Sequence, residues 1–362
     1  MDKITKRITT SSTWAASSDL AAVDLPRDGL ITEVTIRANI TATLTATAVD
    51  DWLRRVIQNI KIEGDGGRAY LGMSGDQMSR LLSLWGEVLG LGPTLHSNGG
   101  GIALAAPDVG SASFRSLFKF HPGSNPRDPF DLTAAIPARA LSMLQTKLTT
   151  TANSVCDANG TISAGTFNYE VCEVLGLPVP QGLMTPVGST LAYAHTANYS
   201  DFSYDIDIPA GAFLRSIIML IQDDTATVSR RKDDEVTGVK IKRPKTGDYI
   251  LEQTIYELKQ AMMARYGIRA MSHDVGPIGA IATTRPAPGA ALAVVPAGFV
   301  IIDLRAFAAP ENGISPLYGL DLRPFQTGDF KLGLTIENYA SGDDTIIYWD
   351  QLLPVDANLV GR

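Results

Sequence analysis

The sequence predicts an all-β fold of two tandem sandwiches, and three observations support this prediction. β-branched residues dominate the apolar segments, and Gly, Pro, Asn and Asp interrupt them at short intervals. Charged residues make up only 19% of the 362 residues, which is low for a chain with many exposed helices. Six features of the first half recur in the same order in the second half. This length suits two domains of ordinary size.

The clearest repeated feature is a strand, a Gly-rich turn, a short apolar step and a helix. It reads IKIEGDGGRAYLGMSGDQMSRLLSLW at 60–85, and VKIKRPKTGDYILEQTIYELKQAMMARY begins the second copy at Val239. Each half then closes on an apolar strand that ends in Leu-Pro-Val, at 177–179 and 353–355. We interpret the chain as two copies of one structural unit.

Most segments of each copy have the two-residue period of a strand with one buried face. In LITEVTIRANITATL the apolar residues that share a face are Leu30, Val34, Ile36, Ile40 and Leu44. KLGLTIEN (331–338) alternates in the same way. FLRSIIMLI (213–221) and GFVIIDL (298–304) are apolar on both faces, which predicts strands covered on both sides.

Each copy also contains one helix. Ser74 and Gln77 form a capping-box pattern before the first helix. The apolar residues at helical spacing are Met78, Leu81, Leu82, Trp85, Val88 and Leu89 in the first copy and Leu251, Ile255, Leu258, Met262 and Tyr266 in the second. We interpret both stripes as helices that pack on a sheet.

The predicted organisation is two eight-stranded sandwiches, each with an inserted short helix and a long loop. The segments are an N-terminal arm (1–19), the first sandwich (20–180), a linker (181–200), the second sandwich (201–356) and a C-terminal tail (357–362). The long loops after the helices are 92–113 and 267–298. Loops of this length inside a compact domain are uncommon and are usually functional or flexible.

Catalytic, cofactor and metal motifs are not found in the sequence. The four histidines are far apart, and we interpret each as a solvated loop residue: His96, His121, His195 and His273. Cys156 and Cys172 are not part of a CxxC motif and are interpreted as incidental thiols. GDGG at 64–67 joins two predicted strands, so we interpret it as a tight turn and not as a phosphate site.

The acidic clusters of the sequence leave open a catalytic site built from carboxylates. They lie at Asp201, Asp205 and Asp207, at Asp223 and Asp224, at Asp233, Asp234 and Glu235, and at Asp343 and Asp344. Two carboxylates brought together by folding can act as general acid and base. Acidic turns beside strand ends are commonplace, so we favour a structural role for them.

The N-terminal segment MDKITKRITTSSTWAASS combines basic residues, a Ser/Thr run and one aromatic residue without a core pattern. One interpretation is a frayed terminus. The other is an arm in which Lys3, Lys6, Arg7 and Trp14 contact a neighbouring subunit or anionic lipid headgroups. The formal net charge of −7 argues against a broad nucleic-acid-binding surface elsewhere.

The sequence shows neither a continuous apolar signal-peptide core near its start nor a transmembrane helix. We therefore expect the protein to be made and folded in the cytoplasm.

The order of elements carried by NIKIEGDGGRAYLGMSGDQMSRLL and GVKIKRPKTGDYILEQTIYELKQ resembles one family over about residues 20 to 356. It is the double jelly-roll major capsid proteins of tailless, membrane-containing icosahedral bacteriophages, which are related in architecture to adenovirus capsid proteins.

The resemblance implies a structural protein of the virion and no enzyme activity. It implies a homotrimer whose six jelly rolls form a pseudo-hexagonal block, with neighbouring trimers and minor capsid or penton proteins as partners. The long loops would crown the outer face or lock trimers together, and the arm would point inwards to the internal membrane or an adjacent capsomer. Two alternatives are a two-jelly-roll glycan-processing enzyme similar to peptide N-glycosidases and a carbohydrate-binding or spike module. Fold alone does not decide among them.

Overall fold

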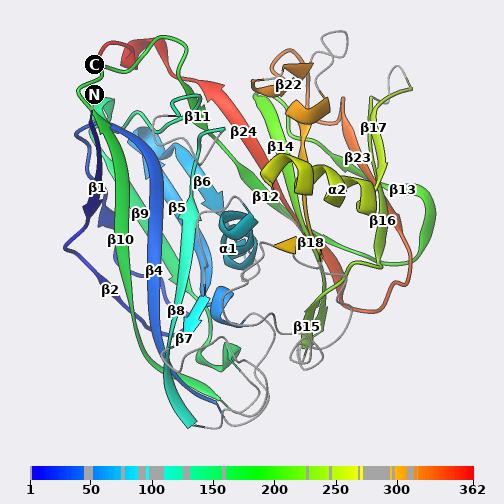
Figure 1. Ribbon diagram of the computed structural model, residues 1–362, viewed down its shortest axis with the longest axis horizontal. Helices are drawn as coiled ribbons and strands as arrows, with labels where there is room; N and C mark the ends of the chain where they lie inside the picture. Colours follow the sequence, from blue (N-terminus) through cyan, green and yellow to red (C-terminus); the bar gives the residue numbers. More distant parts are fainter. Residues whose placement is uncertain are drawn as a thin grey trace. The chain divides into compact units, whose positions relative to one another are not determined.

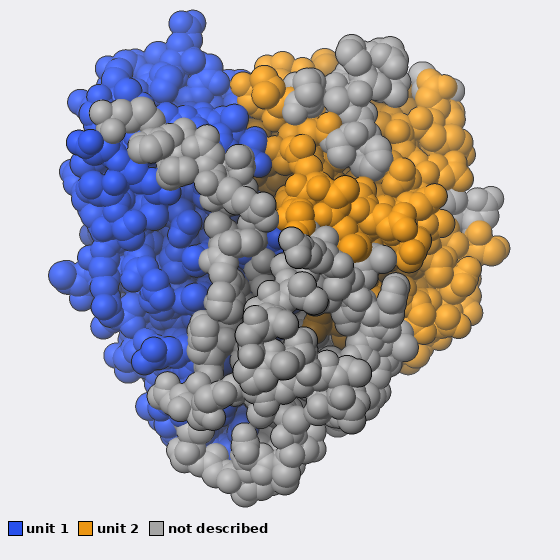
Figure 2. All heavy atoms as spheres, viewed as in Figure 1, with its two compact units in different colours: residues 1–189, 278–283, 353–362 blue, residues 190–277, 284–352 orange. Residues whose placement is uncertain are grey.

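The computed structural model is mostly β-structure, and its described residues include two α-helices of eleven and twelve residues (Figure 1). It describes residues 2–44, 52–74, 78–88, 95–97, 110–124, 131–156, 160–225, 228–243, 247–267, 270–271, 294–295, 298–307, 314–315 and 317–362. These described residues divide into two compact units (Figure 2). Unit 1 holds Met1–Ser189 and Leu353–Arg362, and unit 2 holds Thr190–Pro277 and Thr284–Leu352.

Unit 1 contains two antiparallel sheets, which we name sheet A and sheet B. Sheet A has the order β1-β10-β4-β8-β7, with β2 also paired to β10, and sheet B has the order β3-β9-β5-β6. The sheet A strands are β1 (Asp2–Arg7), β2 (Ser12–Thr13), β4 (Leu30–Leu44), β7 (Leu95–Ser97), β8 (Gly110–Phe120) and β10 (Thr161–Leu175). The sheet B strands are β3 (Val23–Asp24), β5 (Ile57–Gly64), β6 (Ala69–Met73) and β9 (Leu144–Thr150).

Unit 2 also contains two larger sheets, named sheet C and sheet D. In sheet C, β14 pairs with β24, β20, β22 and β15, while β12 and β11 (Met184–Pro186) pair with β24 and β21 pairs with β22. Its strands are β12 (Ser189–Ala194), β14 (Phe213–Thr225), β15 (Val228–Arg231), β20 (Phe299–Asp303), β21 (Ile314–Ser315), β22 (Gly319–Asp321) and β24 (Asp343–Pro354). Sheet D has the order β13-β23-β16-β17, from β13 (Tyr199–Asp207), β16 (Val236–Arg243), β17 (Asp248–Thr254) and β23 (Lys331–Ile336).

The two units share one strand order, which confirms the predicted duplication of fold. The order β1-β10-β4-β8 in sheet A matches β12-β24-β14-β20 in sheet C, and β3-β9-β5-β6 matches β13-β23-β16-β17. Each unit therefore has eight equivalent strands among the described residues, arranged as two four-stranded sheets. This arrangement is a jelly roll. The predicted fold class, two tandem eight-stranded jelly rolls with inserted helices, is confirmed.

The burial of the strands follows the predicted patterns. Along β4, residues 34, 36, 38, 40, 42 and 44 are buried while 37, 39, 41 and 43 are only partly buried. In β14 five consecutive residues from Ile217 to Ile221 are buried, so both faces of this strand are covered. The turn at 64–67 contains Gly66 and Gly67 at positive φ and joins β5 to β6, as predicted.

Both predicted helices are present. In α1 (Met78–Val88) the buried apolar residues are Leu81, Leu82, Leu84, Trp85 and Val88, and the predicted Ser74–Gln77 capping box falls partly outside the described residues. α2 (Ile255–Tyr266) buries Ile255, Leu258 and Met262. Its capping box is Thr254 with Glu257, a pattern that the sequence contains and that our sequence analysis did not use.

Two segments expected to lie outside the sandwiches contain strands. The arm expected at 1–19 includes β1, which pairs with β10 over six residues, and the linker expected at 181–200 includes β12. Both are the first strand of a jelly roll. Their own apolar pattern is short, and each is stabilised by the long strand beside it. Most residues of the predicted loops 92–113 and 267–298 lie outside the described residues.

A glycine pair tests how closely sheet C is packed. Gly319 and Gly211 both have positive φ, but a Cβ on Gly319 would lie 2.2 Å from the Leu214 carbonyl oxygen, whereas a Cβ on Gly211 meets nothing within 4 Å. We expect Gly211→Ala to lower the free energy of unfolding by about 1 kcal/mol through backbone strain. Gly319→Ala should cost at least about 2 kcal/mol more because β14 and β22 must separate. Urea unfolding measures both; equal losses would contradict this packing.

Candidate assembly surface and buried charges

Of the predicted arm residues, Lys6 is held by carboxylates of unit 1. Glu173 on β10 is fully buried, and its Oε1 accepts the backbone N–H groups of Asp28 and Gly29 at 3.1 and 3.2 Å. The Nζ of Lys6 lies 2.8 Å from Oε2 of Glu173 and also contacts the Asp28 carboxylate. Lys6 therefore neutralises a charge that would be costly to bury alone.

The pKa of Lys6 reflects this position. Burial by itself would lower the pKa of the ammonium group, but the hydrogen bonds to Asp28 and Glu173 outweigh this effect and raise it. Lys6 thus stays charged wherever the protein is folded at neutral pH. Its role in the structure is to complete the ion cluster between β1 and β10.

Trp14 is also part of unit 1. It is 9% exposed, and its indole lies 6.1 Å from the Phe167 ring between centroids. The backbone N–H of Trp14 donates to the Gly165 carbonyl at 2.9 Å. A Cβ on Gly165 would lie 2.7 Å from Cδ1 of Ile40 and 3.0 Å from Cβ of Trp14, so glycine is needed for this contact. Lys3 and Arg7 lie on β1, where Arg7 is exposed and Lys3 is partly buried.

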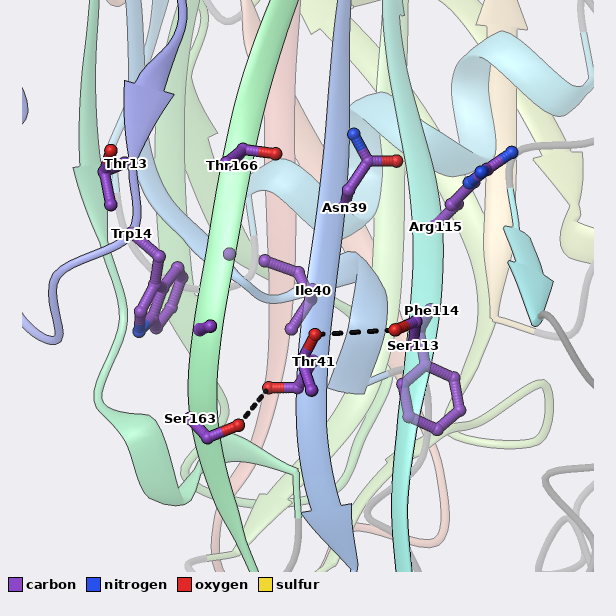
Figure 3. A pocket seen from close by; sticks show the side chains of 12 residues that line it. Thr13, Trp14, Asn39, Ile40, Thr41, Ser113, Phe114, Arg115, Ser163 and Thr166 are labelled. Carbon is purple, nitrogen blue, oxygen red and sulfur yellow. Dashed lines mark hydrogen bonds between the residues drawn. The ribbon is translucent and has the colours of Figure 1, made fainter.

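A groove of about 580 Å³ lies beside Trp14 on sheet A (Figure 3). It is lined by Thr13, Trp14, Asn39, Ile40, Thr41, Ser113, Phe114, Arg115, Ser163, Ala164, Gly165 and Thr166. Figure 3 shows the hydroxyl groups of Ser113 and Ser163 directed at β4, where they contact Thr41 at 3.5 and 3.2 Å. The lining contains neither a carboxylate nor a histidine, so it holds no acid–base pair for glycoside hydrolysis.

Short polar side chains make up half of the twelve residues that line this groove, and the others include Trp14, Phe114 and Arg115. β4, β8 and β10 present Ser, Thr and Asn residues here, and the charged pair above them joins Nη2 of Arg37 to Oε2 of Glu170 at 2.6 Å. Short neutral side chains make a sheet face flat and lose little solvation when another surface covers it. Such a face is suited to lateral contact with another folded surface.

Unit 2 brings together several of the predicted acidic residues with cations. Nζ of Lys232 donates to Oδ1 of Asp343 at 2.6 Å, and Asp233 pairs with the buried Lys259 of α2. Asp223 lies opposite Asp343 in the β14–β24 register. These carboxylates are compensated by neighbouring ammonium groups, which is typical of structural ion pairs.

The interpretation of all four histidines as solvated is wrong for two of them. His121 and His195 are only 3% and 4% exposed. Nδ1 of His195 contacts the Glu235 carboxylate, and its Nε2 lies 3.0 Å from the hydroxyl of Thr345. Burial raises the pKa of Glu235, although His195 acts in the opposite direction. The side chains of His96 and His273 lie outside the described residues.

Two further buried ion pairs were not anticipated from the sequence. Arg215 on β14 donates to Asp350 on β24 at 2.7 and 2.9 Å, and the Ser216 hydroxyl donates to the same carboxylate. Burial alone would raise the pKa of Asp303, but hydrogen bonds from Arg305 outweigh it and lower the pKa. The only signal in the sequence is a charged residue next to apolar residues of a strand: Arg215 in β14, Asp350 in β24 and Asp303 in β20.

Among the described residues, no group of three or more His, Cys, Asp or Glu side chains is placed to hold a metal ion. In the same part of the chain, no helix is long and apolar enough to cross a membrane.

No protein-family model matches the sequence, and no curated protein matches it either. Solved structures do match. The major capsid protein of Sulfolobus turreted icosahedral virus, STIV, superimposes with a TM-score of 0.69 at 13% identity, covering 98% of each chain. The major capsid protein P2 of bacteriophage PM2 matches with a TM-score of 0.55 at 10% identity over 99% of each chain.

A third match is the capsid of the virus PBCV-1, with a TM-score of 0.58 at 11% identity, covering 97% of this chain and 94% of the other. Identities of 10–13% establish similarity of fold. Because the matches span both units, the whole chain has the double jelly-roll fold of these capsid proteins.

The ion cluster at Glu173 gives a direct prediction. Lys6→Met should lower the free energy of unfolding by about 2 kcal/mol, because Glu173 loses its cation while remaining buried. Lys3→Met, on the same strand, is the matched control and should change the free energy of unfolding by less than about 0.5 kcal/mol.

The effect should not depend on pH near neutrality. Since the pKa of Lys6 is raised, the stability that Lys6 contributes is present below about pH 10 and is lost only as the pH rises through the raised value. The Lys6→Met deficit in urea unfolding should thus be the same at pH 6 and pH 8. Equal, small effects of both variants would contradict the assignment.

Glu235 gives a second, pH-dependent prediction. A carboxyl whose pKa is raised in the folded state costs stability once it ionises, so this cost appears as the pH rises above about 4.3. Glu235→Gln keeps the side-chain shape without the charge. The melting temperature of the wild type relative to this variant should therefore fall between pH 4 and pH 7. A relative melting temperature that rises over this interval would show that the contact with His195 dominates instead.

Proposed function

We propose that this protein is the major capsid protein of an icosahedral virus and has a structural, non-enzymatic role in the virion. The observation that carries the proposal is the full-length double jelly roll, in which both units share one strand order and which matches capsid proteins over nearly the whole chain. The charged groups of the described core support a structural role, since they are engaged in ion pairs. The groove beside Trp14, without carboxylates in its lining, gives no support to glycan hydrolysis.

We further propose that three copies form a closed trimer. A chain with two similar jelly rolls gives a trimer with six, which approximates a hexagon and can tile a flat facet. Such a ring needs a heterologous contact, in which two different surfaces of each chain meet. The part of sheet A around the groove, with its Ser, Thr and Asn side chains, is one surface suited to such a contact. Neighbouring trimers and minor capsid or penton proteins are the proposed further partners.

The proposed contact of the N-terminal residues with an internal membrane or a neighbouring capsomer now concerns Lys3 and Arg7. Lys6 is engaged by Glu173 and Asp28, and Trp14 is buried. Two cationic side chains on one strand suit anionic lipid headgroups or an acidic neighbouring surface. The loops 92–113 and 267–298 keep their proposed role in crowning the shell or locking trimers together.

The proposal predicts the mass of the protein in solution. Light scattering on the purified protein should give a species of three times the 38.7 kDa chain, and negative-stain images of the same fraction should show a hexagonal outline. A monomer at all concentrations tested, including those near the solubility limit, would contradict the capsid assignment. A catalytic assay is then the next step, with glycopeptides as substrates.

A further inference from the structure

Unit 1 is built from two separate pieces of the chain. It combines Met1–Ser189 with Leu353–Arg362, and the described residues of unit 2 all lie between these two pieces. We name residues 353–362 the strap, which begins with the last two residues of β24, the closing strand of unit 2. Unit 1 is therefore complete only when a segment that follows unit 2 in the sequence has joined it.

Main-chain hydrogen bonds fix both ends of the strap on the segment that follows β10. The Val355 N–H donates to the Leu183 carbonyl at 2.8 Å. At the other end, the Gly361 N–H donates to the Val179 carbonyl at 2.9 Å, and the Val179 N–H donates to the main-chain oxygen of Arg362 at 3.1 Å. The strap thus lies along one segment of unit 1 in a single alignment.

The strap also supplies apolar side chains to the core of unit 1. Val355 is one of six buried residues of an apolar cluster, and Leu359 and Val360 pack against this cluster. The other five buried members are Leu30, Ala135, Ala140, Val179 and Leu183. Leu30 is the first residue of β4, which lies in the middle of the strand order of sheet A. Loss of the strap would expose this cluster to water, at a cost in free energy that grows with the apolar area uncovered.

Folding of unit 2 brings the strap to its place. Val355 and its partner Leu183 are about 170 residues apart in the sequence, so an unfolded chain pays a large loop entropy to join them. In the folded chain β24 pairs with β11, and β11 directly follows Leu183. Once β24 is in position, the strap therefore emerges beside the segment that it binds, and the entropy of closing the long loop has already been lost.

We propose that the strap makes completion of the first jelly roll conditional on completion of the second. Domains usually fold in the order in which they are synthesised, whereas here the first unit is finished last. The dependence runs in one direction, because unit 1 recruits residues that follow unit 2, while the described residues of unit 2 lie in one stretch between the two pieces of unit 1. This device goes beyond the proposed function. Under that function, it keeps chains with an unfinished second jelly roll out of the shell.

The first test changes the apolar side chains of the strap in the full-length protein. Leu359→Ser with Val360→Ser removes two side chains that pack on the cluster, and Ala357→Ser with Asn358→Ser is the matched control, because both of those residues are exposed. Hydrogen exchange followed by mass spectrometry should show the peptide that carries Val179 exchanging at least about tenfold faster in the first variant than in the wild type. The control variant should match the wild type. Equal exchange in all three proteins would overturn the strap.

The second test measures the direction of the dependence. Ile347→Ala on β24 opens a cavity in unit 2, and Leu148→Ala on β9 opens one in unit 1, since both side chains are buried. Ile347→Ala should accelerate exchange in both units, including the Val179 peptide, while Leu148→Ala should accelerate it in unit 1 alone. Ile347→Val replaces the alanine variant if that variant does not fold, with a smaller shift in the same direction. Exchange at Val179 that ignores the lesion at 347, or a lesion at 148 that loosens unit 2 equally, would show that the two jelly rolls are completed without this order.

Discussion

The pairing of each closing strand with strands from the beginning of its own half is the constraint on which both units depend. β10 pairs with β4 from Leu30 opposite Val174 to Thr43 opposite Thr161, and it also pairs with β1. β24 occupies the same position between β12 and β14. Until the closing strand is in place, the central strand lacks a neighbour and the first strand has no sheet to join. Contacts of such long sequence separation cost loop entropy before they contribute stability.

Buried ion pairs help to fix the register in which these strands pair. Glu173 lies near the end of β10 and Asp350 near the end of β24, so each closing strand carries a buried carboxylate close to its end. Their partners come from the beginning of the same jelly roll: Lys6 for Glu173, and Arg215 with Ser216 for Asp350. A slip of one residue would separate each carboxylate from its partners and turn the apolar face outwards. These pairs therefore contribute more to a unique alignment than to net stability.

The sequence predicts most of the fold because the long strands carry their own periodic signal. The apolar alternation in β4, the two-sided burial of β14 and both helices can be predicted without a structure. β1 and β12 cannot be assigned in this way. β1 is mostly polar, β12 has only a short apolar pattern, and a strand of six residues obtains its stability from the neighbour it pairs with. Because β1 lacks a periodic apolar signal, we interpret residues 1–19 as an arm when only the sequence is considered.

The candidate site was harder to predict than the fold, for a related reason. Buried ion pairs and the His195–Glu235 contact join residues that are far apart in the sequence, and no spacing rule connects them. Basic residues can be recognised in a sequence, but whether a cation is free depends on a carboxylate that another strand supplies. Lys6 and Lys3 look alike in the sequence, and only the pairing of β1 with β10 places Lys6 beside Glu173.

The distribution of charge also bears on assembly. Covering a surface of exposed lysines and glutamates requires each charge to lose its hydration and find a partner, whereas covering short hydroxyl side chains costs far less. In this chain many of the charges are already paired within a unit, and the face of sheet A beside Trp14 presents Ser, Thr and Asn. In the proposed assembly, charges that are already paired inside the subunit would lower the cost of burying its sides, because they need no new partner.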